Sequence, residues 1–446
     1  MKLKLVVASM SVLGLVSCPV FAAHQSKHKH HEKVMKQEVR NDYKEDYKEM
    51  APAEVCMISA SSMTMNEMSQ NLGRSIPSPC NPGWFNRVQF SGGINVDLGK
   101  FGNRNGNYMG ENYQRFSLND AYLNVAATIN DWTKAFASIS YNTASINDPS
   151  GALPIVGEYS SAYSNNVISG SSSALQLEQA YATIGNFDMS PFFIQIGKQF
   201  QDYSRYEIHP ITRSLTQVIS ETLATSLEGG FIANGFSGTI FAFDDPLAKV
   251  GQTNRTTNYG AALGYSQPSD QLGWDIGGAY LYNMIGVNDV AYVVNQNNAK
   301  VALDGGGYNT RVGATAWYAD VNSGPFVLGV RYTTALQRFN MTDLAKYGLA
   351  PSTTGAKPWA AGIQAGYGFD AWSKDQNIYL GYQASREASG LLIPKSRWLV
   401  GYGIEMFGKN TSTSIEWDHD MAYSVSNGGT GDNTNLVSVR QSVKFG

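Results

Sequence analysis

Long apolar runs are scarce in this sequence. After residue 23 there is no stretch of about eighteen consecutive apolar residues, which is the length that a transmembrane helix needs. Charged residues are also few, at 15% of the 446 positions, and the formal net charge is -3. A slightly acidic chain lacks the basic footprint of a nucleic-acid-binding protein. These deficits exclude a helical membrane protein and predict that the chain has no nucleic-acid partner.

The first residues have the features of a secretory signal. Two lysines precede an apolar run, and small residues follow at Ala22 and Ala23. We therefore assign residues 1–23 to a cleaved signal peptide, which predicts export from the cytoplasm. An alternative interprets the apolar and small residues before Cys18 as a lipoprotein cleavage site, with Cys18 lipidated. Pro19, directly after this cysteine, favours simple cleavage.

Cysteine is rare, with three in the whole chain. Cleavage of the signal removes Cys18 and leaves Cys56 and Cys80. An even number of cysteines in an exported chain predicts a disulfide between these two. Two free thiols are the alternative, which an oxidising compartment disfavours.

Residues 24–85 differ in composition from the rest of the chain and form a predicted periplasmic tail. The segment 24–50 is rich in His, Lys, Glu and Asp, and one narrow apolar stripe suggests a short helix. Residues 51–85 contain several prolines and read as an irregular linker. Four tail histidines offer imidazole nitrogens to a transition metal: His24, His28, His30 and His31. Because a flexible tail fixes no ligand geometry, we predict no specific metal site and no cofactor.

From residue 86 to residue 446 the hydrophobic pattern has a period of two. Residues 273–283 show it clearly, with these two sets on opposite faces: Trp274, Ile276, Gly278, Tyr280 and Tyr282, against Asp275, Gly277, Ala279, Leu281 and Asn283. The first set suits lipid and the second suits water. Aromatic residues gather near the ends of such segments, as in the interfacial girdles of transmembrane barrels.

Sixteen such segments can be counted, and they predict an all-β, 16-stranded antiparallel transmembrane barrel. The predicted strands are 87–98, 113–128, 133–143, 173–186, 192–200, 223–233, 235–243, 257–266, 273–283, 310–320, 325–333, 358–369, 376–385, 396–406, 411–421 and 434–445. Their connections alternate between short and long, as expected of periplasmic turns and outer loops. An even number of strands places both barrel ends, and the tail, in the periplasm. The predicted location is therefore the outer membrane of a Gram-negative bacterium.

Two further features support the barrel over a soluble array of β-sandwiches. All fifteen prolines fall outside the predicted strand interiors, since proline cannot donate to the hydrogen-bond ladder. The last residues alternate Val439, Val443 and Phe445 with polar positions, like a terminal barrel strand. A sandwich array would not explain alternating short and long connections.

The predicted register turns both signs of charge into the lumen. The inward positions are Glu178, Glu228, Asp275, Arg311, Arg331, Arg397, Glu405, Glu416, Asp418 and Asp420. A water-filled pore tolerates charged walls without any specific site, so generic lining is one interpretation. The other is that Arg311, Arg331 and Arg397 attract an anionic solute while Glu405, Glu416 and Asp418 shape the field along its path.

The long loop 201–222 is the most polar and aromatic of the predicted outer loops. It includes Arg205, His209 and Arg213. Binding groups are commonly placed on loops that a rigid scaffold carries. Three possibilities follow from the sequence: an inward fold that narrows the pore with Arg205 and Arg213 on the solute path, an external binding surface, or an ordinary exposed loop.

At this loop the sequence resembles the legiobactin-uptake siderophore porins of intracellular γ-proteobacteria. The resemblance rests on Gly197-Lys198-Gln199-Phe200, His209, Ser214-Leu215-Thr216 and Glu221-Thr222. The chain departs from that pattern at Asp202, Tyr203 and Ser204, and again at Thr212 and Arg213. The resemblance implies a plugless outer-membrane barrel through which a ferric siderophore passes, with outer-membrane lipid and a small-molecule solute as partners. It implies no catalytic residue.

A barrel of this kind could also perform other functions. A general diffusion porin fits the same barrel, and an adhesin or structural barrel would also use long loops. The sequence leaves open whether copies of the chain form a homo-oligomer. An enzyme would need a catalytic histidine, and outside the tail only His209 and His419 occur. Our register points His419 toward lipid, so we predict no enzymatic activity, although a slip of one residue would turn it inward.

Overall fold

The computed structural model describes residues 88–101, 114–141, 175–205, 211–267, 269, 271–299, 307–348, 350–408 and 410–445. The predicted signal peptide, the tail with its histidines and the cysteine pair Cys56 and Cys80 lie outside these ranges. So does His209.

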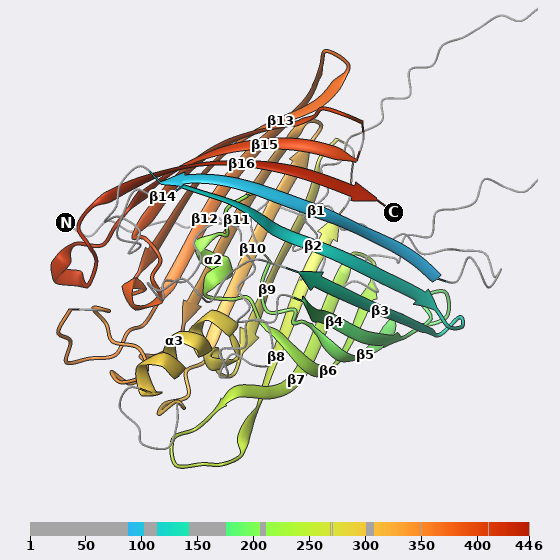
Figure 1. Ribbon diagram of the computed structural model, residues 1–446. Helices are drawn as coiled ribbons and strands as arrows, with labels where there is room; N and C mark the ends of the chain where they lie inside the picture. Colours follow the sequence, from blue (N-terminus) through green and yellow to red (C-terminus); the bar gives the residue numbers. More distant parts are fainter. Residues whose placement is uncertain are drawn as a thin grey trace, which may run out of the picture.

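Sixteen antiparallel strands form one closed barrel (Figure 1). In chain order they are β1 Val88–Phe101, β2 Gln114–Thr128, β3 Thr133–Tyr141, β4 Leu175–Ile184, β5 Phe192–Phe200, β6 Leu223–Ala233, β7 Phe236–Ala248, β8 Arg255–Gln267, β9 Gly273–Leu281, β10 Ala314–Ser323, β11 Phe326–Ala335, β12 Trp359–Ala371, β13 Lys374–Arg386, β14 Ser396–Glu405, β15 Thr411–Met421 and β16 Asn433–Phe445. Each strand pairs with its neighbours in sequence, and β1 pairs with β16 to close the barrel. The predicted fold class and strand count are confirmed.

Short turns and long loops alternate along the described strands. The turn between β6 and β7 has two residues, Asn234 (φ 52°) and Gly235 (φ 83°), and both adopt the left-handed conformation that a two-residue hairpin favours. β1 starts and β16 ends at the side of the short turns, where Gly92 pairs with Phe445. The termini of the barrel therefore share the predicted periplasmic side.

The alternation of side chains matches the predicted lipid and lumen faces. In β9, Ile276 and Tyr280 are exposed while Asp275 and Gly277 are buried. In β12, Ile363 is exposed and Gln364 is buried. His419 lies on the outer face, stacked on Trp417, so the register slip that would turn it inward does not occur.

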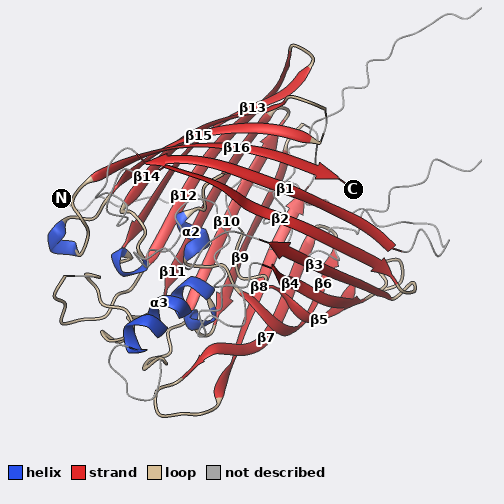
Figure 2. Ribbon diagram, in the orientation of Figure 1, coloured by secondary structure: helices blue, strands red, loops and turns tan. Residues whose placement is uncertain are grey.

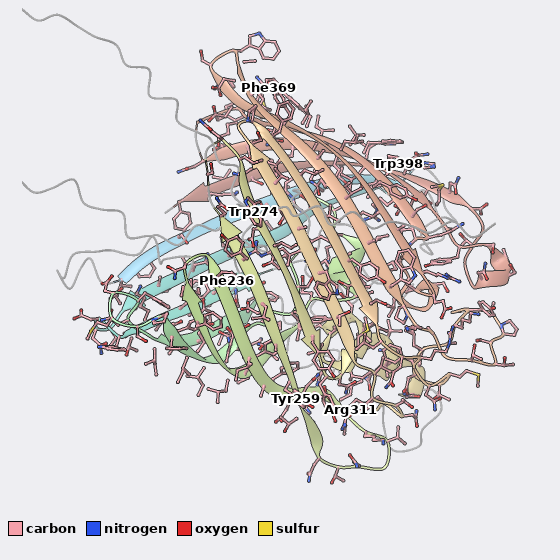
Figure 3. All side chains as sticks on the ribbon, turned by 180° about the vertical axis from the view of Figure 1, so that it is seen from behind. Phe236, Tyr259, Trp274, Arg311, Phe369 and Trp398 are labelled. Carbon is pink, nitrogen blue, oxygen red and sulfur yellow. The ribbon has the colours of Figure 1, made fainter. Side chains whose placement is uncertain are left out.

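Aromatic side chains form two bands on the outer face. The turn-end band includes Phe192, Phe236, Tyr265, Trp274, Phe326, Tyr367 and Phe369, and the loop-end band includes Tyr259, Tyr282, Tyr332, Trp359, Tyr382, Trp398 and Trp417. Figure 3 shows Phe236, Trp274 and Phe369 from the first band and Tyr259 and Trp398 from the second. The eight residue steps from Trp359 to Tyr367 span about 26 Å of strand, or roughly 20 Å of membrane after tilting. This spacing suits the apolar band of an outer-membrane barrel.

One prediction about proline is wrong. Pro246 lies inside β7, which continues to Ala248 instead of ending near residue 243. The pairing of β7 with β8 breaks at this point, between Asp244 and Ala248, so the missing amide of Pro246 costs no ladder hydrogen bond.

The helices of the described residues lie at the loop end or inside the barrel (Figure 2). They are α2 Leu215–Val218, α3 Asn288–Ala299 and the short 3-10 turns η3 Met284–Gly286, η4 Ser389–Leu391 and η5 Val425–Asn427. Within the described ranges, no helix has the length and apolar character needed to cross a membrane.

The two faces of β12 allow a direct test of the register. Ile363 lies midway between the two aromatic bands, so Ile363→Lys would put a charge near the centre of the bilayer. We expect it to lower the free energy of unfolding by about 2–4 kcal/mol. Gln364→Lys, one residue along, puts the same charge in the lumen and should cost less than half as much. Urea unfolding of both variants refolded in lipid vesicles measures the difference, and equal costs would contradict the register.

Candidate functional site

The described parts of the loop 201–222, residues 201–205 and 211–222, contact the inner wall of the barrel. The first anchor of the loop is Arg205, which donates a hydrogen bond to Asp275 on the inner face of β9. The guanidinium also stacks on the ring of Tyr318 of β10, 4.3 Å from the ring centroid. Burial acts to lower the pKa of Arg205, but the combined interactions with Asp275, Tyr318 and Asp320 outweigh it and raise the pKa. Arg205 is therefore a fixed cation on the β9–β10 wall.

The second anchor joins the loop to the wall formed by β15. The backbone N–H of Thr212 donates to Glu416 Oε1 at 2.9 Å, and its hydroxyl donates to Asp418 Oδ2 at 2.7 Å. Glu416 also accepts a 2.7 Å hydrogen bond from the Tyr379 hydroxyl. Because these strand residues all face inward and are buried, Thr212 is held inside the barrel.

The next residues continue along the same wall as α2, which Figure 1 shows enclosed by the strands. Ser214 caps this turn by accepting from the Gln217 N–H. The Leu215 N–H donates to the side chain of Gln383 on β13 at 2.8 Å. The Arg213 carbonyl accepts from Arg397 Nη1 on β14 at 3.0 Å. Of the three interpretations left open by the sequence, an inward fold is the one found in the described parts of the loop.

The loop is also tied to α3, which belongs to the connection between β9 and β10. Arg213 Nη2 lies 2.6 Å from Asp289 and 3.6 Å from Glu221. The Leu223 N–H donates to Asn288 Oδ1 at 2.7 Å as the chain enters β6. The segment 213–223 is therefore linked to α3 at its start, through Arg213, and at its end, through Leu223.

An apolar cluster fills the interior at the loop end beside β7 to β13. Buried residues of η3, α3 and α2 pack there against inward side chains of the strands, and the cluster includes Leu215, Ile219, Phe241, Phe243, Met284, Ile285, Val287, Val290, Val294, Ala314, Ala316, Ala335 and Ala360. The inward residues at the loop end of β10, β11 and β12 include the small side chains of Ala314, Ala316, Ala335 and Ala360, which leave room for the helices. The interior of the barrel is thus asymmetric, because apolar side chains fill the side next to β7 to β13.

The described arginines of the inner wall and the inward loop are each paired with an aspartate. The pairs are Arg205–Asp275, Arg213–Asp289, Arg331–Asp320, Arg397–Asp420 and Arg440–Asp97. The predicted inward residues Glu178, Glu228, Glu416 and Asp418 are buried as well, and Glu405 is half-buried at the turn end of β14. The structure thus brings Arg213, Arg397, Glu416 and Asp418 together at the loop, while Arg205 and Arg331 meet around Tyr318.

The inward assignment of Arg311 is wrong. Arg311 precedes β10, and the odd-numbered positions of this segment, including Trp317, face outward. Its guanidinium stacks on Tyr282, 4.4 Å from the ring centroid, and Tyr282 in turn stacks on exposed Tyr259. Figure 3 shows Arg311 beside Tyr259. Arg311 therefore belongs to the outer face at the loop end.

Polar side chains line the inner wall from β16 through β4. They include Ser91, Asn95, Asn124, Ser138, Ser140, Ser438 and Ser442. The side-chain oxygens of Asn124, Ser140 and Ser438 have no protein partner in the described structure. Such oxygens are normally satisfied by water. This wall therefore has the character of a hydrated surface, in contrast to the apolar filling opposite.

Gly197 sets the direction in which β5 enters the loop. Its φ of 139° is unfavourable for other residues, and an added Cβ would lie 2.2 Å from the Ala180 carbonyl oxygen and 2.5 Å from Tyr181 Cα. Glycine is therefore needed at the first position of the Gly-Lys-Gln-Phe motif.

Replacement of Gly197 by alanine should destabilise the barrel by about 1–3 kcal/mol, because the backbone of β4 must shift. Gly229→Ala is the matched control, since its Cβ would meet nothing closer than 3.9 Å. Urea unfolding of both variants in vesicles gives the comparison. Equal stability of the two would show that β5 has no such constraint.

The part of the chain that the structure describes contains no candidate metal-binding site. No group of three or more His, Cys, Asp or Glu residues is arranged there to hold a metal ion. His419 is instead hydrogen-bonded to Asn435 on the outer face.

Sequence comparison finds relatives in two bacteria. The chain is 23% identical over 357 residues to a UPF0422 protein of Coxiella burnetii, covering 79% of this chain and 68% of that protein. It is 25% identical over 358 residues to UPF0422 protein lpl2888 of Legionella pneumophila strain Lens, covering 74% of this chain. The match spans 61% of that Legionella protein, less than two thirds of its length. No family model matches the chain.

Structure comparison finds porins. An anion-selective porin from Comamonas acidovorans aligns with a TM-score of 0.50 at 9% identity, covering 80% of this chain and 99% of the porin. The outer membrane channel DcaP of Acinetobacter baumannii aligns with a TM-score of 0.49 at 10% identity, covering 80% and 97%. The first likeness shows a shared fold. Together with the apolar outer face and the two aromatic bands, it makes this chain a porin-like β-barrel of the outer membrane.

Proposed function

We propose that this barrel is a channel for a small solute and that the solute is a ferric siderophore. The observation that carries the channel proposal is the loop 201–222, which is anchored inside the barrel on the β9–β10 wall and again on the β13–β15 wall. A closed barrel does not need such a loop for closure, and an adhesin would present its loops outward. An inward loop has a clear use in narrowing a passage.

The polar wall supports passage of solute along β16 to β4. Its hydroxyl and amide groups offer hydrogen bonds. Its described charges are engaged within the wall, since Arg440 makes two hydrogen bonds to Asp97 and Glu178 accepts one from Ser138. A solute on this side would be recognised by its shape and hydrogen-bonding groups. The siderophore assignment rests on the sequence resemblance at the Gly-Lys-Gln-Phe motif, and a general diffusion porin is the alternative that this largely uncharged wall also supports.

Attraction of an anion by uncommitted arginines finds no support in the described lumen. Arg331 and Arg397 each face an aspartate within the same wall, so their charges are locally compensated. The cargo is therefore better sought among neutral or weakly charged ferric complexes than among strongly anionic ones.

Single-channel recording in planar bilayers tests both parts of the proposal. Ferric complexes of hydroxamate, catecholate and carboxylate siderophores would be titrated, with iron-free forms and sugars of similar size as controls. Saturable block by one ferric complex supports siderophore uptake. Conductance without any selective block supports a general porin, and absence of conductance would contradict a channel.

The variant Asn124→Ala changes the polar wall, and Leu123→Ala makes a similar truncation on the lipid face of the same strand. If solute passes along this wall, block should weaken in Asn124→Ala and stay unchanged in Leu123→Ala. Equal block in both variants would place the path elsewhere.

A further inference from the structure

Four cations gather on the outer surface above β11, β12 and β13. We call them the outer basic patch: Arg338, Lys346, Lys357 and Arg386. The carboxylate of Glu387 lies beside Arg338, Lys346 and the Lys357 amide. Arg338 makes two hydrogen bonds to Glu387, of 2.6 and 3.2 Å, and the Lys357 N–H donates to the same carboxylate at 2.8 Å. Lys346 lies 4.9 Å from the ring centroid of Tyr347 and acts electrostatically on Glu387.

The patch has an excess of positive charge. Burial acts to raise the pKa of Glu387, but the hydrogen bonds from Arg338 and the Lys357 amide outweigh it and lower the pKa. Glu387 is therefore ionised at neutral pH and balances one cation, which is Arg338. The ammonium of Lys357 and the guanidinium of Arg386 project from exposed residues. An anion arriving at this surface meets more positive than negative charge.

The position of Arg386 shows where the patch lies relative to the membrane. This residue is the last of β13 and sits directly across from Trp359 of the loop-end aromatic band, so both side chains lie on the lipid-facing side of the barrel. Trp359 contacts Tyr332 of the same band, with 6.2 Å between ring centroids. Aromatic bands mark the level of the lipid headgroups. The cations therefore start at that level and continue into the outer loops.

We propose that the outer basic patch binds the phosphate groups of anionic lipid in the outer leaflet. A planar guanidinium such as that of Arg386 can hold a phosphate with two hydrogen bonds, and lysine ammonium groups add attraction to the same charge. The surface is exposed and continuous with the lipid-facing wall, which suits a lipid phosphate better than a soluble anion. Binding would fix the depth and orientation of the barrel on the β11–β13 side.

Binding can be measured on the purified barrel in an uncharged detergent by native mass spectrometry. The probe is bisphosphorylated lipid A, and the comparison lipid is the same molecule without its phosphates. We expect saturable binding of the phosphorylated lipid only, weakening as salt is raised. Removal of two charges in Lys357→Gln/Arg386→Gln should weaken it roughly 25-fold, since each basic residue near an anionic surface contributes about fivefold. Arg255→Gln, an exposed arginine at the loop end of β8, should bind like the native chain.

Three results would overturn the proposal. They are unchanged affinity in the double variant, equal binding of the dephosphorylated lipid, and full displacement of the lipid by millimolar pyrophosphate, which would indicate a site for soluble anions. Native conductance of the double variant in bilayers confirms that it folds, because the patch lies outside the lumen.

Discussion

Release of loop 201–222 from the inner wall is expected to raise single-channel conductance roughly two- to fourfold, because the loop takes up part of the lumen that a 16-stranded barrel would otherwise leave to water. The change that should achieve this is Thr212→Val together with Arg213→Gln. The first removes the hydroxyl that donates to Asp418 at 2.7 Å, and the second removes the 2.6 Å ion pair with Asp289. The loop then keeps its anchor at Arg205 but loses its side-chain contacts with β15 and α3.

Loss of the Thr212 contact also changes the wall that it leaves. Glu416 and Asp418 lie on the same face of β15 and both accept hydrogen bonds from Thr212. With the hydroxyl gone, Asp418 must take water as its partner, which draws solvent between the loop and the strand. We therefore expect noisier, flickering current as well as larger steps.

Planar-bilayer recording at fixed salt measures both changes. The matched control is Thr342→Val, which removes a hydroxyl hydrogen-bonded to Asn340 and Asn309 in an exposed loop outside the lumen. Its conductance should equal that of the native chain. If the Thr212 and Arg213 variant also conducts like the native chain, the described loop is not the constriction.

The barrel itself was predictable because each strand carries a strong local signal. Alternation in segments such as β9 and β12 depends only on which side faces lipid, and lipid imposes the same demand on every strand. The ends of strands were less predictable where the hydrogen-bond pairing between neighbouring strands becomes irregular. β7 continues past residue 243 through Pro246, since the ladder with β8 is already interrupted there and a proline is tolerated.

The interior was less predictable, because its contents come from connections whose paths are not periodic. Val287, Val290 and Val294 are apolar residues in a region predicted as an outer loop, and they are buried inside the barrel mouth. Their spacing of three and four is the available signal, together with inward alanines such as Ala314 and Ala316. The side-chain partners of Thr212 could not be inferred, because contacts between residues two hundred positions apart leave no mark on a single sequence.

The error at Arg311 has a different origin. The sequence prediction places Arg311, just before β10, inward because charge suits water better than lipid. The outer face is not uniformly apolar, however, since the headgroup level accepts a guanidinium that stacks on an aromatic ring. Position along the strand therefore matters as much as the face, and Arg311 lies at the level of Tyr282 and Tyr259.

Loss of Arg397 should be among the most damaging single changes in the lumen. This arginine is 1% exposed and makes hydrogen bonds of 2.6 and 2.7 Å to the two carboxylate oxygens of Asp420. Its third hydrogen bond goes to the Arg213 carbonyl of the inward loop. Arg397→Gln leaves a buried carboxylate without its counter-charge. Such a change typically costs about 3–5 kcal/mol of unfolding free energy.

The double variant Arg397→Gln/Asp420→Asn removes both charges and should recover more than half of that loss, because neither side chain is then a buried unpaired ion. Arg338→Gln breaks an ion pair of similar length with Glu387, but Arg338 is 46% exposed and should cost less than about 1 kcal/mol. Urea unfolding of all three variants in vesicles provides the comparison. A large loss in Arg397→Gln that the second substitution does not recover would mean that the hydrogen bond to the loop carbonyl, and not the compensation of Asp420, is what the arginine supplies.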